Sequence, residues 1–301
     1  MNNASSHQKN PVVEWSEPSP KMPRPPLTRL ALSGCGWLFP YHIGVLSCLK
    51  SHQWVTPSTI LSGVSGGALV AVGEASGLSE QDMMDVAVDI VRRQYSTTNT
   101  TSIWGNIGAT LGTTLNLALP NDAHIKCNSR VSIAVTQVSD EDSSYFVPLM
   151  SCLPLAPNNV WSDPTMFGYN TDEEHHFLNK DDLIQGCLAS SHIPFYMDKK
   201  FSKKWRDSSW VDGGMKNILP PMPEQEDQSS CVQSLPYSIM TTFRNDTCTI
   251  VTPASFEFNV VTELLPWSFV PCKDISNLQR LRDVGYKNAE LFMDKQQAQY
   301  R

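Results

Sequence analysis

The pattern of apolar and polar residues predicts two strand–turn–helix units in the first 80 residues. Residues 28–32 form a short apolar strand, and the apolar positions of 41–50 recur with the spacing of a helix. Residues 59–62 are expected to be a second strand, and 68–75 a second helix rich in small residues. A glycine-rich turn separates strand from helix in each unit. Two such units predict an α/β fold whose central sheet is largely parallel and covered by helices.

The rest of the chain continues the alternation of strands and helices. Helices are expected at 81–94, 103–119, 183–188 and 275–299, and strands at 130–138, 210–211, 238–242 and 249–252. Residues 222–231 are expected to be a polar loop. The sequence shows no internal repeat, and its amino-acid composition does not change in a way that would indicate a second domain. We therefore expect one domain with a flexible proline-rich leader at 1–26, a core at 27–221, and C-terminal strands and a helix at 222–301.

The segment 103–119 carries an apolar stripe that can be interpreted in two ways. Its members recur every four residues: Ile103, Ile107, Leu111 and Leu115. A stripe of this kind usually faces the core, and we expect that here. The alternative is a lid or a lipid-contacting helix, because Trp104 adjoins the stripe and the polar face carries Asn and Thr without charge.

Composition narrows the possible partners and the compartment. The formal net charge of -7 and pI of about 5.5 argue against a nucleic-acid partner and against electrostatic attraction to an anionic membrane. The eight cysteines are scattered without a Cys-x-x-Cys pair, which is typical of reduced intracellular thiols. Residues 1–26 contain no apolar signal segment, and the most apolar stretch, 60–75, is too short to span a bilayer. A cytoplasmic protein is expected, in at most peripheral contact with membranes or lipid droplets.

The motif Gly63-Val64-Ser65-Gly66-Gly67 fits the nucleophile elbow Gly-x-Ser-x-Gly, with a strand before it and a small-residue helix after it. Gly63 and Gly67 suit an elbow because a serine in a strained turn tolerates little bulk around it. The following helix directs its N-terminal dipole at the serine oxygen and at a developing oxyanion. The alternative is a glycine-rich turn whose serine is incidental.

The turn Ser-Gly-Cys-Gly at 33–36 closes the first strand and opens the next helix, where bare backbone N–H groups can bind an anion. Beside a serine elbow, such groups would hold the oxyanion of a tetrahedral intermediate. The candidate donors are the N–H groups of Gly34, Cys35, Gly36 and Gly66. The alternative is a dinucleotide-binding turn. Against it, Phe39 occupies the position of the third glycine and no acidic residue ends the second strand.

Asp212 follows a short expected strand and precedes two glycines, so its carboxylate can approach another loop closely. It could accept a hydrogen bond from Ser65 and act as a general base. The alternative is an Asx turn, which is a common role for an Asp-Gly pair.

Together these motifs resemble the patatin-like phospholipase family. The resemblance rests on Leu-Ser-Gly-Cys-Gly-Trp-Leu-Phe-Pro-Tyr-His-Ile-Gly-Val at 32–45, Gly-Val-Ser-Gly-Gly at 63–67 and Asp-Gly-Gly at 212–214. Gly-Cys-Gly and Tyr-His-x-Gly-Val are most similar to the animal-type, adipose triglyceride lipase-like branch. The resemblance covers residues 28–221, and the remainder only loosely.

The resemblance implies a three-layer α/β/α sandwich in which Ser65 is the nucleophile, Asp212 its partner and the 34–36 loop the oxyanion hole. It implies a serine lipid acyl hydrolase that cleaves acyl esters of glycerolipids, triacylglycerol or phospholipid, with no cofactor or metal. Plant members that act on phosphate-bearing lipids carry a basic residue in this loop. This chain has none, which favours neutral lipids. Phe39 replaces the family's usual glycine, so the outer half of the loop is expected to differ in shape.

Three alternatives stay open. On the same dyad the chain could be an acyltransferase, or it could be a non-catalytic lipid-binding scaffold. A Ser–Asp–His triad is also conceivable, with Asp163 or Asp172 and His192 following Ser65 in sequence. An elbow this near the N-terminus leaves room for fewer preceding strands than triad hydrolases of this class have. His42 is expected to be a packing histidine, and no carboxylate spacing near His175 indicates a metal site.

Overall fold

The computed structural model describes residues 26–97, 105–138, 162–221, 229–232, 249–251 and 260–299. The expected leader, apart from residue 26, and the expected strand at 238–242 lie outside these residues. All statements about the structure concern the described part of the chain.

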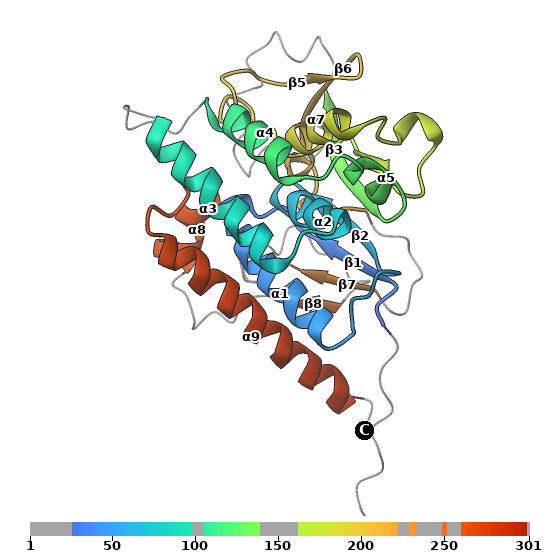
Figure 1. Ribbon diagram of the computed structural model, residues 1–301, viewed down its shortest axis with the longest axis vertical. Coiled ribbons are helices and arrows are strands. Elements are labelled where there is room, and N and C mark those ends of the chain that lie inside the picture. The colour runs from blue at the N-terminus through green and yellow to red at the C-terminus, as the bar shows by residue number, and fades with distance from the viewer. Residues whose placement is uncertain are drawn as a thin grey trace, which may run out of the picture.

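Eight strands of the described residues form one sheet in the order β5-β6-β3-β2-β1-β7-β8, with β4 also paired to β3 (Figure 1). Strands β1, β2, β3, β7 and β8 pair in parallel, whereas β4 and β6 run antiparallel to β3 and β5 runs antiparallel to β6. The α/β class is as expected, but the sheet is mixed. The strands are β1 Arg29–Leu32, β2 Ile60–Val64, β3 Val131–Val138, β4 Pro164–Gly168, β5 Lys203–Trp205, β6 Ser208–Asp212, β7 Ser229–Val232 and β8 Thr249–Val251.

Helices connect these strands, and most begin and end close to the expected positions. Among the described helices, α5 and α8 were not expected. Helices α2 and α7 pack against the sheet, α1 lies beside α2, and α9 lies along α1 (Figure 1). The helices are α1 Phe39–Ser51, α2 Gly66–Ser76, α3 Glu80–Thr97, α4 Ile107–Ala118, α5 Ala123–Asn128, α7 Lys180–Ser190, α8 Leu265–Phe269 and α9 Ile275–Gln299. Short 3-10 turns lie at η1 Gly36–Leu38, η3 Glu173–His175 and η4 Gly213–Met215, and a π-helical turn at η7 Val260–Leu264.

Strand β7 corrects the expectation of a polar loop at 222–231 for residues 229–231, whereas 222–228 lie outside the described residues. It pairs in parallel with β1, opposite β2, so β1 is hydrogen-bonded along both edges. Its sequence Ser-Ser-Cys-Val has little apolar alternation, and the pairing with β1 is a tertiary contact that overrides this weak local signal.

The apolar stripe of 103–119 faces the core over the part that is described. Ile107, Leu111 and Leu115 on α4 are buried, and α4 packs against α3 and α7. The core interpretation is therefore correct for these residues and the lipid-contacting alternative is wrong for them. Ile103 and Trp104 lie outside the described residues.

No helix in the described ranges has both the length and the apolar character needed to cross a bilayer. The described cysteine side chains are buried free thiols: Cys35, Cys48, Cys127, Cys187 and Cys272.

Helices α1 and α9 touch backbone to backbone through two glycines. A Cβ on Gly44 would overlap the carbonyl oxygen of Arg282, and a Cβ on Gly285 would overlap that of Tyr41. The absence of a side chain at these two positions lets the C-terminal helix lie directly on the helix that follows the 33–36 turn.

We expect Gly285→Ala to push α9 away from α1 and to lower the free energy of unfolding by about 1–3 kcal/mol, the usual cost of overpacking. Thermal and urea denaturation measure this loss. The matched control is Gly112→Ala on α4, where the added Cβ would meet Leu188 at an ordinary 3.4 Å. That variant should be as stable as the original or up to about 1 kcal/mol more stable, because alanine favours helix. Equal stability of the two variants would contradict the close helix contact.

Candidate active site

Ser65 occupies the sharp turn between β2 and α2, with φ 53° and ψ -125°. This left-handed region is unfavourable for a residue with a side chain and costs about 1–3 kcal/mol. The turn is tight: a Cβ on Gly63 would lie 2.6 Å from the backbone of Ala68, and one on Gly67 would overlap the carbonyl oxygen of Leu32. Both glycines of the expected elbow are therefore required by close backbone approach.

Ser190 holds the backbone of the elbow in place. The N–H of Ser65 donates to Ser190 Oγ at 2.9 Å, and the Ser190 hydroxyl donates to the carbonyl oxygen of Ala134 at 2.7 Å. Ser190 is the buried last residue of α7, and Ala134 lies on β3. The hydrogen bonds link the strained turn to two other elements. The supporting role of Ser190 was not predicted, because the sequence shows only a pair of serines at the end of an apolar helix.

Asp212 ends β6 and is buried beside the elbow. Its N–H donates to the carbonyl oxygen of His192 at 2.9 Å, and its Oδ1 accepts the N–H of Gly214 at 2.7 Å. The second contact is the Asx-turn interaction that the sequence left open. It occupies one side of the carboxylate, and the side chain of Ser65 lies close enough to the carboxylate to lower its pKa. Ser65 and Asp212 thus lie near each other, and their roles as a catalytic pair stay a prediction.

Burial raises the pKa of Asp212 to about 6, and the hydrogen bonds from Ser65 and Gly214 only partly oppose this shift. The nearby Cys35 thiol has its pKa raised well above the ordinary value, first by burial and then by the charge of Asp212. Cys35 is therefore a protonated thiol and no competing nucleophile near neutral pH.

The Ser-Gly-Cys-Gly turn at 33–36 lies against the start of α2. A Cβ on Gly66 would lie 2.6 Å from Cys35 Sγ and 2.8 Å from the carbonyl oxygen of Gly36. Gly36 has φ 53° and opens η1, and Gly66 opens α2. The N–H groups of both residues are first in their helices and have no partner within them. The two backbone segments thus lie in contact beside Ser65.

Gly34 departs from its expected role. Its N–H donates to the carbonyl oxygen of Ile218 at 2.7 Å, so it is not available to bind an oxyanion in this conformation. Of the four candidate donors, those of Cys35, Gly36 and Gly66 remain. The sequence carried no sign of this hydrogen bond, because Ile218 lies in a distant loop after η4.

A small cavity of about 50 Å³ opens in front of Ser65. Its walls are largely apolar side chains from η1, α1, α2, α3 and α4, including Trp37, Phe39, Leu69, Ile90 and Ile107. The buried hydroxyl of Ser191 also lines it and has no hydrogen-bond partner among the described residues. A cavity of this size holds a few water molecules and no acyl chain.

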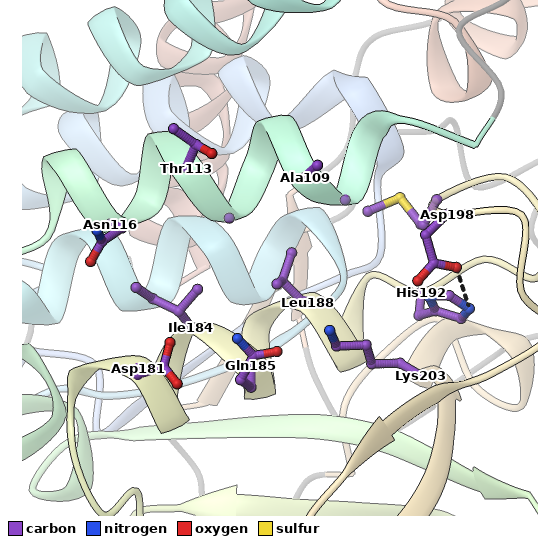
Figure 2. Close-up of a pocket in the computed structure, with 13 residues that line it drawn as sticks. Ala109, Thr113, Asn116, Asp181, Ile184, Gln185, Leu188, His192, Asp198 and Lys203 are labelled. Carbon is purple, nitrogen blue, oxygen red and sulfur yellow. Dashed lines mark ion pairs between the residues drawn. The ribbon is translucent and has the colours of Figure 1, made fainter.

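A larger groove of about 570 Å³ lies between α4 and α7 and contains neither Ser65 nor Asp212 (Figure 2). His192 faces it, with Nε2 at 3.8 Å from Asp198 Oδ1 and 3.2 Å from the carbonyl oxygen of Lys200. Burial lowers the pKa of His192. Asp163 is instead 3.7 Å from Lys216, and no contact between His192 and Asp163 or Asp172 is found in the described part of the chain. The Ser–Asp–His triad is not assembled.

His42 and His175 lie in different environments. His42 is fully buried on α1, neither ring nitrogen has a partner among the described residues, and burial lowers its pKa to about 3. It is a neutral packing histidine, as expected. His175 lies with Asp172 and Glu174 so that their ligand atoms are within 4.8 Å of one another. The sequence did not predict this cluster. Both carboxylates are exposed, and such surface groups are common without a metal.

The chain is similar to proteins of one family. The model of the family described as patatin-like phospholipase matches residues 30–223. Patatin-like phospholipase domain-containing protein 2 of Mus musculus is 29% identical over 204 residues, which cover 66% of this chain and 35% of that protein. The 1-acylglycerol-3-phosphate O-acyltransferase of Homo sapiens is 28% identical over 196 residues, which cover 64% of this chain and 34% of that protein. This chain thus spans about a third of the length of these relatives.

The chain is also similar to a further human protein and to a bacterial protein of known structure. Patatin-like phospholipase domain-containing protein 4 of Homo sapiens is 26% identical over 201 residues, which cover 64% of this chain and 67% of that protein. The crystal structure of VipD from Legionella pneumophila matches with a TM-score of 0.52 and 10% identity, over 90% of this chain and 67% of that chain. This likeness shows a shared fold.

Replacing Ser190 with alanine should loosen the elbow. Without the hydroxyl, the buried N–H of Ser65 loses its acceptor, and we expect the free energy of unfolding to fall by about 1–3 kcal/mol. The matched control is Ser191→Ala, whose hydroxyl makes no hydrogen bond within the described residues. Chemical denaturation of both variants measures the difference. If Ser191→Ala were destabilised as much as Ser190→Ala, the hydrogen bonds to Ser65 and Ala134 would not explain the loss.

Proposed function

Because this chain belongs to the patatin-like phospholipase family, we propose that it is a serine lipid acyl hydrolase that cleaves acyl esters of glycerolipids, with Ser65 as nucleophile and Asp212 as its base. The observation that carries the proposal is the pairing of a strained, glycine-flanked Ser65 with the buried carboxylate of Asp212 at the edge of an apolar cavity. The carboxylate's raised pKa also suits a base that takes a proton near neutral pH.

In the first half-reaction, Ser65 Oγ attacks the ester carbonyl carbon while Asp212 accepts the hydroxyl proton. The C–O bond to the alcohol then breaks, Asp212 returns the proton to the departing alkoxide, and an acyl-Ser65 ester remains. In the second half-reaction, Asp212 takes a proton from water, the hydroxide attacks the acyl-Ser65 carbonyl, and the fatty acid leaves as Ser65 regains its proton.

The negative charge on the carbonyl oxygen needs donors in both half-reactions. We assign them to the backbone N–H groups of Cys35, Gly36 and Gly66, at the contact between the 33–36 turn and the start of α2. The N-terminal end of the α2 dipole adds to this stabilisation. Removing one donor of this kind typically slows a reaction by about 10²–10³-fold.

The cavity indicates the class of substrate. Its side chains are mainly apolar, which suits an acyl chain, and the 33–36 turn carries no basic residue to bind a phosphate. We therefore propose a neutral glycerolipid, with triacylglycerol before phospholipid, reached by peripheral contact with a lipid surface. A panel of triacylglycerol, diacylglycerol, phospholipid and retinyl ester tests this order.

Acyl transfer is a second candidate, favoured by the name of the human relative described above, a 1-acylglycerol-3-phosphate O-acyltransferase. The acyl-Ser65 ester would be the same, and an alcohol acceptor would replace water in the second half-reaction. Product analysis with and without a glyceride acceptor distinguishes the two activities, because only transfer forms a new glyceride.

Ser65→Ala should abolish hydrolysis and leave the fold intact, because the change removes one hydroxyl at the cavity. A fluorophosphonate probe should label the original protein at Ser65, as read by mass spectrometry, and should fail to label the variant. Retention of a tenth of the activity by Ser65→Ala would exclude Ser65 as the nucleophile. Labelling of Ser65 without turnover of any lipid in the panel would favour the non-catalytic scaffold.

The pH dependence should report Asp212. Only the ionised carboxylate accepts a proton, and its pKa is about 6. Hence kcat/KM should fall as the pH drops below 6. An ordinary aspartate base, with a pKa of about 3.9, would lose activity only at a lower pH. Asp212→Asn should lose about 10²–10⁴-fold in rate and with it this acid limb. An acid limb near pH 4 in the original protein would contradict the assignment.

The stability of Asp212→Asn provides the control. Because the folded-state pKa lies above the unfolded one, the folded protein binds more protons between the two values. Stability therefore falls as the pH rises through this window, and ionised Asp212 is a cost above about pH 6. Asn carries no such charge, so the variant should melt at or above the original temperature at pH 8. A strongly lowered melting temperature would mean that its inactivity reflects unfolding.

A further inference from the structure

A short segment around α8, residues 265–270, borders the cavity that contains Ser65. Ser268 lines this cavity together with Ser65 and Gly36, and a Cβ on Gly36 would overlap the carbonyl oxygen of Ser268. The α8 segment therefore contacts the backbone of the turn that we assign to the oxyanion. In Figure 1 it is the orange-red turn beside the start of α9.

Two tyrosine hydroxyls fasten the α8 segment to the rest of the molecule. The hydroxyl of Tyr196 donates to the carbonyl oxygen of Phe269 and accepts the indole N–H of Trp37 at 2.7 Å. The hydroxyl of Tyr95 donates to the carbonyl oxygen of Pro271 at 2.5 Å. Buried residues flank the segment at both ends, Leu264 before it and Cys272 after it. The segment is thus flanked by buried residues at both ends, and Tyr196 holds it near its C-terminal end.

The outer face of the α8 segment is apolar. Leu265 is 38% exposed, Phe269 56% and Val270 45%, and none of residues 265–270 is charged. Large exposed apolar side chains gathered in one segment mark an interaction surface.

The charged side chains next to the segment interact with residues outside it. Glu263 forms an ion pair with Arg280 at 3.1 Å, and the Lys273 ammonium lies 5.3 Å from the centre of the Tyr95 ring. The formal net charge is -7 and the segment itself carries no cation that would attract an anionic surface. The matching partner is an uncharged lipid surface.

The size of the cavity links this surface to Ser65. A space of about 50 Å³ cannot hold an acyl chain, so a lipid ester reaches Ser65 only when a wall moves. Among the elements that line the cavity, the α8 segment is short, and it joins a π-helical turn to a loop. π-helical turns often occur at functional sites. Moving it in water would expose its inner side chains, whereas a lipid surface would bury them.

We propose that the α8 segment is a lid whose Leu265 and Phe269 insert into an uncharged lipid surface, and that this contact opens the cavity to the acyl chain. The proposal rests on the proposed function of Ser65, because it names the surface that delivers the substrate to that residue. Tyr196 is the latch: its hydrogen bond to Phe269 holds the closed position.

The first experiment measures lipid binding without turnover. Leu265→Ser with Phe269→Ser, in the Ser65→Ala background, should weaken partitioning onto phosphatidylcholine vesicles about tenfold, since two apolar side chains no longer enter the lipid. The matched control is Ile125→Ser with Leu178→Ser, which removes side chains that are 63% and 72% exposed. Ile125 lies on α5, far from α8 in Figure 1. Equal binding by the lid variant and its control would overturn the proposal.

The second experiment measures opening. Tyr196→Phe removes the latch hydroxyl and keeps the ring, so without lipid a fluorophosphonate should label Ser65 several-fold faster than in the original protein. Adding phosphatidylcholine vesicles should accelerate the original protein and leave the variant nearly unchanged. Identical labelling rates for the two proteins, with and without vesicles, would overturn the lid.

The two experiments also separate this proposal from the proposed function. If Ser65 were not a nucleophile, neither protein would be labelled and no lipid would be cleaved. The vesicle comparison would still decide whether residues 265 and 269 bind lipid, because it uses protein that lacks the Ser65 hydroxyl.

Discussion

The backbone of Ser65 is the constraint on which the site depends. A non-glycine residue at φ 53° is unfavourable, and the turn persists because several elements restrain it. The N–H of Ser65 is bonded to Ser190 at the end of α7, which is bonded in turn to Ala134 in the middle of the sheet. The same strand, β3, pairs with β2 on one side and with β6 on the other. Ser65 directly follows β2, and Asp212 ends β6. The register of these two strands with β3 therefore fixes the relative positions of the two residues, and a shift of either strand would separate them.

The site combines strain with a buried charge, and both reduce stability. Asp212 is buried, and among the described residues the N–H of Gly214 and the side chain of Ser65 favour its ionised form. A better solvated carboxylate would stabilise the fold and would be a weaker base. Burial likewise raises the pKa of the neighbouring Cys35 thiol. Burial strengthens the interaction of backbone N–H groups with a developing charge, so the burial that costs stability would favour the proposed chemistry.

The sequence predicted the parts of the fold and site that local patterns encode. Strand–glycine–helix units placed Ser65, Gly63 and Gly67 correctly, because a tight turn between a strand and a helix has a distinctive composition. It did not predict that Gly34 would be hydrogen-bonded to Ile218, that Ser190 would support the elbow, or that the serine-rich β7 would join the sheet. Each of these depends on a partner far away in the chain, which no local pattern reports. The α8 segment was not predicted, because a helix of five residues is too short for its apolar spacing to stand out in the sequence.

The position of β1 has a consequence for how this unit could be excised or transplanted. The family match ends at residue 223, yet β1 is paired on its far side with β7, and α9 lies on α1 through Gly44 and Gly285. A fragment cut at the end of the match would leave β1, the strand that leads into the oxyanion turn, as an unpaired edge, and would expose the apolar face of α1. Open edges and bare apolar faces of this kind promote aggregation. The boundary of sequence similarity is therefore not a boundary of folding, and any chimaera built on this chain must carry its C-terminal helix along with the serine.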